Sequence, residues 1–165
     1  MPNGDITTHI TVAEDKVVSA KMIAMESFIF CGEEYLPYCF PNDCSIKIVS
    51  KDGENVNFGD VLAHVDGPAS QILTFERVIL NLMQRLCGIS TETYRYCKLN
   101  LPIGFKVMDT RKTTPGLRLF EKHAVSIGGG WNHRSSSRSA RAPPLAAYGV
   151  ANLLNFTSSC VISSM

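Results

Sequence analysis

The sequence has no C-x-x-C pair, no long apolar run and no marked excess of charge of either sign. Its six cysteines are scattered: Cys31, Cys39, Cys44, Cys87, Cys97 and Cys160. Several fall inside strand or helix patterns, which favours reduced, buried thiols over a disulfide framework, and no His and Cys spacing indicates a zinc site. The apolar runs are far shorter than the ~18 residues that span a bilayer, so we expect no membrane partner. A formal net charge of +1 gives no reason to expect nucleic acid.

The two ends of the chain also lack features. Residues 1–5 do not show the basic and then apolar pattern of a signal peptide, which leads us to expect a cytoplasmic protein. No Asp or Glu follows Glu121, and residues 135–165 are rich in Ser, Ala and Arg, with no regular period of apolar residues. We therefore expect this tail to be mostly flexible, with at most a short helix over residues 145–156.

A strand pattern is the first feature that is present. The chain has 165 residues, enough for one ordinary domain or slightly more, and residues 17–24 alternate with a period of two. Apolar runs at residues 27–31, 45–50 and 61–65 predict further strands, and Asp52-Gly53 is a strong hairpin signal. Residues 16–66 are thus predicted to form a small, largely antiparallel sheet.

A helix is predicted to follow, opened by Gly67-Pro68. Its buried stripe recurs at spacings of three and four: Ile72, Phe75, Ile79, Leu82 or Met83, and Leu86. Cys87-Gly88 is predicted to interrupt the helix, and a second helix covers residues 90–98. Glu76 has only apolar neighbours at helical spacing, which predicts a desolvated carboxylate in a buried ion pair. Sheet and helices together define an α+β N-terminal domain over residues 1–104.

A strand, a cationic loop and a helix come next. Residues 105–108 are strand-like, and residues 117–125 have a helical pattern. Between them, Arg111 offers a planar fork for a carboxylate or phosphate, Lys112 a compact charge and Thr110 a hydroxyl donor. Thr114 is predicted to cap the helix, with Pro115 at its first position, so that backbone N–H groups add to the same field. The loop is a candidate anion site.

Three glycines, residues 128–130, are predicted to end this helix. A run without side chains also leaves a backbone that a ligand can approach closely. The histidines His9, His64 and His123 lack such surroundings, and we interpret them as ordinary surface or sheet residues.

Two longer strings carry a family resemblance. Residues 109–118 read DTRKTTPGLR, and residues 128–134 read GGGWNHR. Together they resemble the quinolinate phosphoribosyltransferase family, also called carboxylating nicotinate-nucleotide pyrophosphorylase. Residues 4–8, GDITT, and residues 76–81, ERVILN, fit the same family, so the resemblance covers roughly residues 4–134 in the right order.

The resemblance implies a reaction and a set of binding residues. Quinolinate and phosphoribosyl pyrophosphate would give nicotinate mononucleotide, pyrophosphate and CO₂, a step of NAD biosynthesis, with Mg²⁺ accompanying phosphoribosyl pyrophosphate. No side chain is implied as a nucleophile. The implied homodimer or higher oligomer would place Arg77 in the active site of the neighbouring subunit. The implied substrate-binding residues are Arg77, Thr110, Arg111, Lys112, His133 and Arg134.

The family pattern stops after Arg134. Residues 105–134 would begin an α/β barrel, whereas a complete barrel needs about 250 residues and eight strands. The acidic residues that help the family to hold the ribose phosphate and Mg²⁺ have no counterpart after Glu121. We therefore expect a truncated chain, clipped at its front as well, with an incomplete barrel and little or no activity alone.

Three other interpretations stay open at this stage. In the first, the chain is a non-catalytic fragment that pairs with an intact subunit and donates Arg77. A second alternative is a carrier-type binding module built on the small sheet, although Lys51 lacks the flanking residues of a modifiable carrier lysine. The third is a sibling enzyme that acts on another pyridine carboxylate or in molybdenum metabolism.

Overall fold

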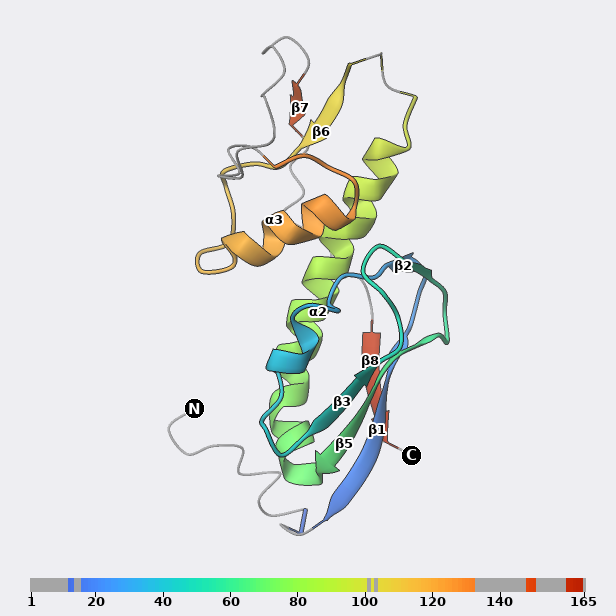
Figure 1. The fold of residues 1–165 in the computed structure, drawn as a ribbon, viewed down its shortest axis with the longest axis vertical. Helices are drawn as coiled ribbons and strands as arrows, with labels where there is room; N and C mark the ends of the chain where they lie inside the picture. Colours follow the sequence, from blue (N-terminus) through green and yellow to red (C-terminus); the bar gives the residue numbers. More distant parts are fainter. Residues whose placement is uncertain are drawn as a thin grey trace.

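The computed structural model describes residues 12–13, 16–100, 102, 104–132, 148–150 and 160–164, and of the last two ranges it describes the backbone. The described part is elongated along one helix, α2 (Ala69–Cys97). A small sheet lies along the first half of α2, and a strand-loop-helix unit lies at its other end (Figure 1). The cationic loop belongs to this second unit.

The sheet is antiparallel, as predicted, in the order β3-β5-β1-β8. Strand β1 (Val17–Ala24) pairs with β5 (Val61–Pro68), and β5 pairs with β3 (Ser45–Ile48). The alternation of β1 places Ala20, Met22 and Ala24 in the core. Strand β8 (Cys160–Ser164) adds an edge against β1.

The Asp52-Gly53 turn is real but does not close a simple hairpin. Gly53 adopts a φ of 86°, and its N–H donates to the carbonyl of Phe30 at 2.9 Å. The turn therefore lies over β2 (Phe28–Ile29), which pairs with β4 (Asn55–Val56), and the chain returns to the sheet only at β5. A carrier module needs its lysine at the tip of a protruding hairpin. Here the backbone two residues after Lys51 is hydrogen-bonded to Phe30, which argues against the carrier interpretation. After Gly32 the chain forms a short 3₁₀ turn, η1 (Leu36–Tyr38), which includes Pro37.

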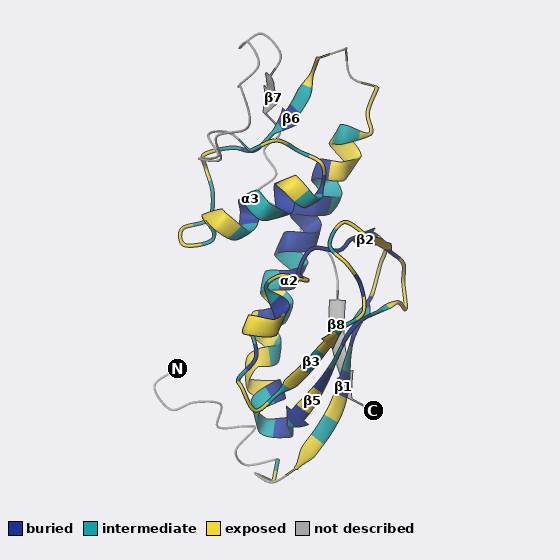
Figure 2. Ribbon diagram, viewed as in Figure 1, coloured by how far each residue is buried: buried dark blue, intermediate teal, exposed yellow. Residues whose placement is uncertain are grey.

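The predicted break at Cys87-Gly88 is absent, because α2 runs through it as one helix of 29 residues. A glycine inside a helix costs about 1 kcal/mol. Burying the flanking Leu86 and Ile89 contributes roughly 1.5–3 kcal/mol each, which outweighs that cost. Figure 2 shows this stretch of α2 as buried, where α3 (Arg118–Ile127) crosses it. Phe75, predicted to be buried, is instead 39% exposed.

The end of α3 packs tightly against α2. Gly128 caps α3, as predicted, and a Cβ at this position would lie 2.4 Å from the carbonyl oxygen of Ser90. A Cβ at Gly130 would lie 2.7 Å from the Thr93 side chain. These two glycines thus admit a neighbouring helix, where the sequence suggested a ligand. The hydroxyl of Ser90 donates to the carbonyl of Ala124 at 2.9 Å and closes the same contact.

Strand β6 (Lys106–Met108) confirms the predicted strand and is parallel to β7 (Tyr148–Val150). Met108 also forms a parallel bridge with Trp131, just beyond α3. The chain therefore makes a strand-helix-strand turn around α3. In the predicted tail, where a flexible segment with at most a helix was expected, β7 and β8 are strands.

Candidate anion-binding site

The cationic loop connects β6 to α3 and holds Thr110, Arg111 and Lys112. The helix starts later than predicted. Thr114 does not cap it, because residues 114–117 form a turn in which the Leu117 N–H donates to the Thr114 carbonyl at 3.0 Å. Leu117 is the N-cap residue and Arg118 the first helical one, since Gly116 has a φ of 80° and interrupts the helical backbone. The loop is therefore longer than the sequence suggested.

The second half of the loop is tied to α2 by a buried ion pair. Glu121 is 4% exposed and accepts hydrogen bonds from Nε and Nη2 of Arg85 at 2.8 and 2.6 Å. Its other oxygen, Oε2, accepts the backbone N–H of Thr114 at 3.1 Å. Arg85 also donates to the Thr114 hydroxyl at 2.7 Å. One carboxylate and one guanidinium thus hold the loop backbone in place.

The first half of the loop is held by a second ion pair. Asp109 is buried, and its Oδ2 accepts a hydrogen bond from Nζ of Lys122 on α3. Its backbone N–H donates to the carbonyl of Trp131 at 3.0 Å. Asp109 is therefore fixed both to α3 and to Trp131, which follows α3, and this sets where the loop leaves β6.

Between these two anchors, the loop presents its cations to solvent. Arg111 and Lys112 are exposed, and within the described residues neither side chain forms an ion pair. The backbone N–H of Lys112 donates to the Thr110 hydroxyl at 3.1 Å, and Arg118 donates to the Thr113 hydroxyl at 3.1 Å. A tethered loop that exposes a guanidinium and an ammonium group on consecutive residues is suited to an anion with several oxygens.

The other predicted binding residues are not brought to this loop within the described chain. Arg77 is exposed on α2, eight positions before Arg85, or about 12 Å along the helix axis. No hydrogen bond or ion pair among the described residues joins it to the loop. His133 and Arg134 lie outside the described residues.

The buried ion pair predicted at Glu76 is wrong. Glu76 is half-buried, and in the described part of the chain it takes part in no ion pair. Among the residues that the structure describes, the buried carboxylates are Asp109 and Glu121. Apolar neighbours at helical spacing, the pattern at Glu76, would not have selected Glu121, because Arg118 lies among its neighbours Leu117, Ala124 and Val125. No pattern in the sequence singled out Arg85 as the partner of a buried carboxylate.

The described residues contain no helix long and apolar enough to cross a membrane. Their sheet, long helix and tethered cationic loop define an α+β protein with a strand-loop-helix unit suited to anions. The N-terminal domain model of quinolinate phosphoribosyl transferase matches residues 5–87, and the C-terminal domain model matches residues 89–140. The chain belongs to the quinolinate phosphoribosyltransferase family.

Relatives agree with this assignment. The chain is 41% identical over 134 residues to the probable nicotinate-nucleotide pyrophosphorylase [carboxylating] of Bacillus subtilis, covering 79% of this chain and 46% of that protein. It is 42% identical over 134 residues to the chloroplastic enzyme of Arabidopsis thaliana, covering 79% of this chain and 38% of that protein. The crystal structure of NadC from Streptococcus pyogenes matches with a TM-score of 0.73 at 36% identity, over 79% of this chain and 47% of that one. The chain thus spans less than half the length of these relatives.

Proposed function

We propose that this chain provides the quinolinate-binding loop of a quinolinate phosphoribosyltransferase, which forms nicotinate mononucleotide, pyrophosphate and CO₂ from quinolinate and phosphoribosyl pyrophosphate. One observation carries the proposal: two exposed cations, Arg111 and Lys112, stand on a loop that ion pairs fix at both ends. The relatives named above carry the name of this enzyme. The proposal divides the chain into an N-terminal domain, residues 1–104, and the beginning of an α/β barrel, residues 105–134.

The geometry suits a dicarboxylate. Quinolinate carries two carboxylates on an aromatic ring, and the Arg111 fork and the Lys112 ammonium can each bind one, while the Thr110 hydroxyl donates a further hydrogen bond. Because Glu121 and Asp109 already hold the loop, little ordering is needed when the ligand binds. The proposal also includes His133 and Arg134. Its support is the bridge between Trp131 and Met108, which brings the chain back beside β6 two residues before His133.

The positive charges of Arg111 and Lys112 can also stabilise the electron density that develops on the ring during the reaction. The ring nitrogen bonds to the ribose as pyrophosphate leaves. CO₂ then departs from the ring, its bonding electrons stay on the ring carbon, and this carbon takes up a proton from solvent. Fixed cations beside the ring stabilise that electron density, and the family's reaction needs no protein nucleophile. The role of Arg111 and Lys112 is therefore to bind and to stabilise charge.

Mg²⁺ does not fit the carboxylates near this loop. Glu121 and Asp109 are both buried and already paired with Arg85 and Lys122. Releasing either one to a metal would leave a partly buried cation without its partner, which is costly. We therefore assign no Mg²⁺ ligand among the described residues.

The proposal includes a second subunit and a cytoplasmic location. Arg77 is exposed on α2 and reaches no loop residue within the described chain, so it is available to a neighbouring copy in a homodimer. The name of the Arabidopsis thaliana relative includes the word chloroplastic, so targeting differs among relatives. A chain of this length is proposed to have little or no activity alone.

The subunit arrangement can be tested by complementation. The full-length Bacillus subtilis relative, with the residue aligned to Arg77 replaced by alanine, is mixed with this chain, and nicotinate mononucleotide formation is measured. We expect the chain alone to be inactive and the mixture to regain activity, because Arg77 enters the other subunit's site. The Arg77→Ala form of this chain is the matched control and should give no rescue. Equal rescue by both forms, or by neither, would count against donation of Arg77.

Ligand binding tests the loop itself. Titration calorimetry should show that the chain binds quinolinate more tightly than nicotinate, which has one carboxylate fewer. Arg111→Ala removes a charge-assisted hydrogen bond of about 2 kcal/mol, so the affinity for quinolinate should fall roughly 30-fold. Arg95→Ala, which removes an exposed cation on α2, is the control and should leave the affinity unchanged. Equal binding of the two acids, or equal effects of the two substitutions, would refute the assignment of the loop.

A further inference from the structure

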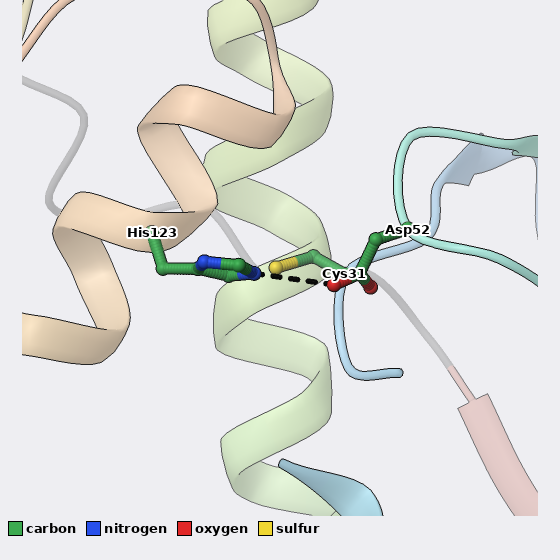
Figure 3. A group of neighbouring side chains, drawn as sticks. All are labelled: Cys31, Asp52 and His123. Atoms are coloured by element: carbon green, nitrogen blue, oxygen red, sulfur yellow. Dashed lines mark hydrogen bonds and ion pairs between the residues drawn. The ribbon is translucent and has the colours of Figure 1, made fainter. Parts of the chain in front are cut away.

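Three side chains from distant parts of the sequence meet between the β2-β4 strand pair and α3. Cys31 follows β2, Asp52 lies in the turn before β4, and His123 is on α3 (Figure 3). One ligand atom from each, the thiol sulfur, a carboxylate oxygen and a ring nitrogen, lies within 4.8 Å of the others. The closest pair is Nε2 of His123 and Oδ2 of Asp52, at 3.1 Å.

The spacing matches a small metal ion. Zn²⁺ binds sulfur at about 2.3 Å and nitrogen or oxygen at about 2.0–2.2 Å, in tetrahedral geometry. Such bond lengths place two ligand atoms roughly 3.3–3.8 Å apart. The three ligand atoms lie within 4.8 Å of one another, and the closest pair, at 3.1 Å, is already near this range.

The surroundings hold the three groups in position. Oδ1 of Asp52 accepts the backbone N–H groups of Gly32 and Glu33 at 2.6 and 2.9 Å, which leaves Oδ2 directed at His123. The ring of His123 packs edge-on against Tyr35, with centroids 5.0 Å apart. Its Nδ1 lies 3.5 Å from a carboxylate oxygen of Glu34. A carboxylate on the second ring nitrogen is the usual arrangement around a metal-bound histidine, because it fixes the tautomer and orients the ring.

A cysteine nucleophile is a poorer explanation of the cluster. Both ring nitrogens of His123 face carboxylates, at 3.1 and 3.5 Å. Neither nitrogen is therefore placed to act as the base that accepts the thiol proton of Cys31. Cys31 is fully buried, so its sulfur is not accessible to a substrate in solvent. A buried thiol is a poor nucleophile, whereas a metal ion displaces the thiol proton outright.

We propose that Cys31, Asp52 and His123 bind one Zn²⁺ ion, with Glu34 orienting the histidine and a water molecule as fourth ligand. On binding, the S–H bond of Cys31 is broken, a bond from sulfur to zinc forms, and the proton passes to solvent. The ion would link the segments beside β2 and β4 to α3, at a place other than the cationic loop, so its role is to join these two parts of the chain. The proposal does not depend on the transferase assignment.

Cobalt titration of the reduced, metal-free full chain tests the site. Co²⁺ substitutes for Zn²⁺ and, bound to a thiolate, gives a sulfur-to-metal charge-transfer band. We expect one equivalent of Co²⁺ to bind with this band, and Zn²⁺ to displace it. Cys31→Ser should abolish the band, and His123→Gln should weaken the affinity by about 100-fold or more, beyond what loss of an orienting group causes.

Matched controls separate the site from adventitious binding. Cys97→Ser removes another free, half-buried thiol, and His64→Gln another half-buried histidine, and both should leave band and affinity unchanged. Asp52→Asn keeps an oxygen for the two backbone N–H groups, so it should fold as judged by circular dichroism and still lose affinity. No stoichiometric binding, persistence of the band in Cys31→Ser, or wild-type affinity in a folded Asp52→Asn variant would overturn the proposal.

Discussion

Replacing Glu121 with glutamine is expected to lower the free energy of unfolding by about 3 kcal/mol. The side chains of Arg85 and Glu121 are 21% and 5% exposed, and the substitution leaves the guanidinium partly buried without its charged partner. It also weakens the acceptor for the Thr114 N–H, so the loop backbone loses one of its two anchors. Urea unfolding followed by circular dichroism measures the change.

A matched control is available two turns further along α2. Glu92 pairs with Arg95, which is 67% exposed, at 3.2 Å, so Glu92→Gln should cost at most about 1 kcal/mol. Similar small losses in both variants would show that the Arg85–Glu121 pair does not hold the loop. A large loss in Glu121→Gln alone, together with weaker quinolinate binding, is the expected pattern.

Replacing Gly128 with alanine is expected to destabilise the chain by about 3 kcal/mol, at the upper end of the cost of overpacking. The added Cβ would lie 2.4 Å from a backbone oxygen of α2 and 2.6 Å from Cβ of Thr93. Since neither atom belongs to a flexible chain end, α3 must move away from α2. Thermal and urea unfolding measure the loss.

Gly116→Ala separates crowding from backbone strain. Gly128 has a φ of −71°, which alanine adopts freely, so its whole cost comes from packing. Gly116 has a φ of 80°, and no atom lies within 4 Å of an added Cβ, so its cost of about 1 kcal/mol is strain alone. If Gly116→Ala were the more damaging substitution, the tight contact between α2 and α3 would be refuted.

Local patterns in the sequence predicted much of this fold. The alternation of β1 and the order of strand, loop and helix from residue 105 are set by neighbouring residues, and they were predicted correctly. The break at Cys87-Gly88 was wrong because its local cost is smaller than the gain from packing α3 on α2. Strand β8 was missed because its partner β1 lies more than a hundred residues away.

In the candidate site, too, local sequence predicted some residues, while others are brought together only by the fold. Arg111 and Lys112 are adjacent in a recognisable string, so the sequence was enough to select them. The residues that hold the loop, Arg85 and Glu121, are 36 positions apart, and only the folded chain brings them together. His123 was interpreted as an ordinary surface or sheet residue, because nothing local shows that Cys31 and Asp52 lie beside it.

Amide chemical shifts of the isotopically labelled chain, followed by nuclear magnetic resonance during a quinolinate titration, test the central assignment most directly. The largest, saturable shifts are predicted for the backbone amides of Thr110, Arg111 and Lys112, with smaller shifts at Thr114. Nicotinate at the same concentrations should move the same amides less. Saturable shifts confined to another surface, or none on this loop, would contradict the assignment of these cations to an aromatic dicarboxylate.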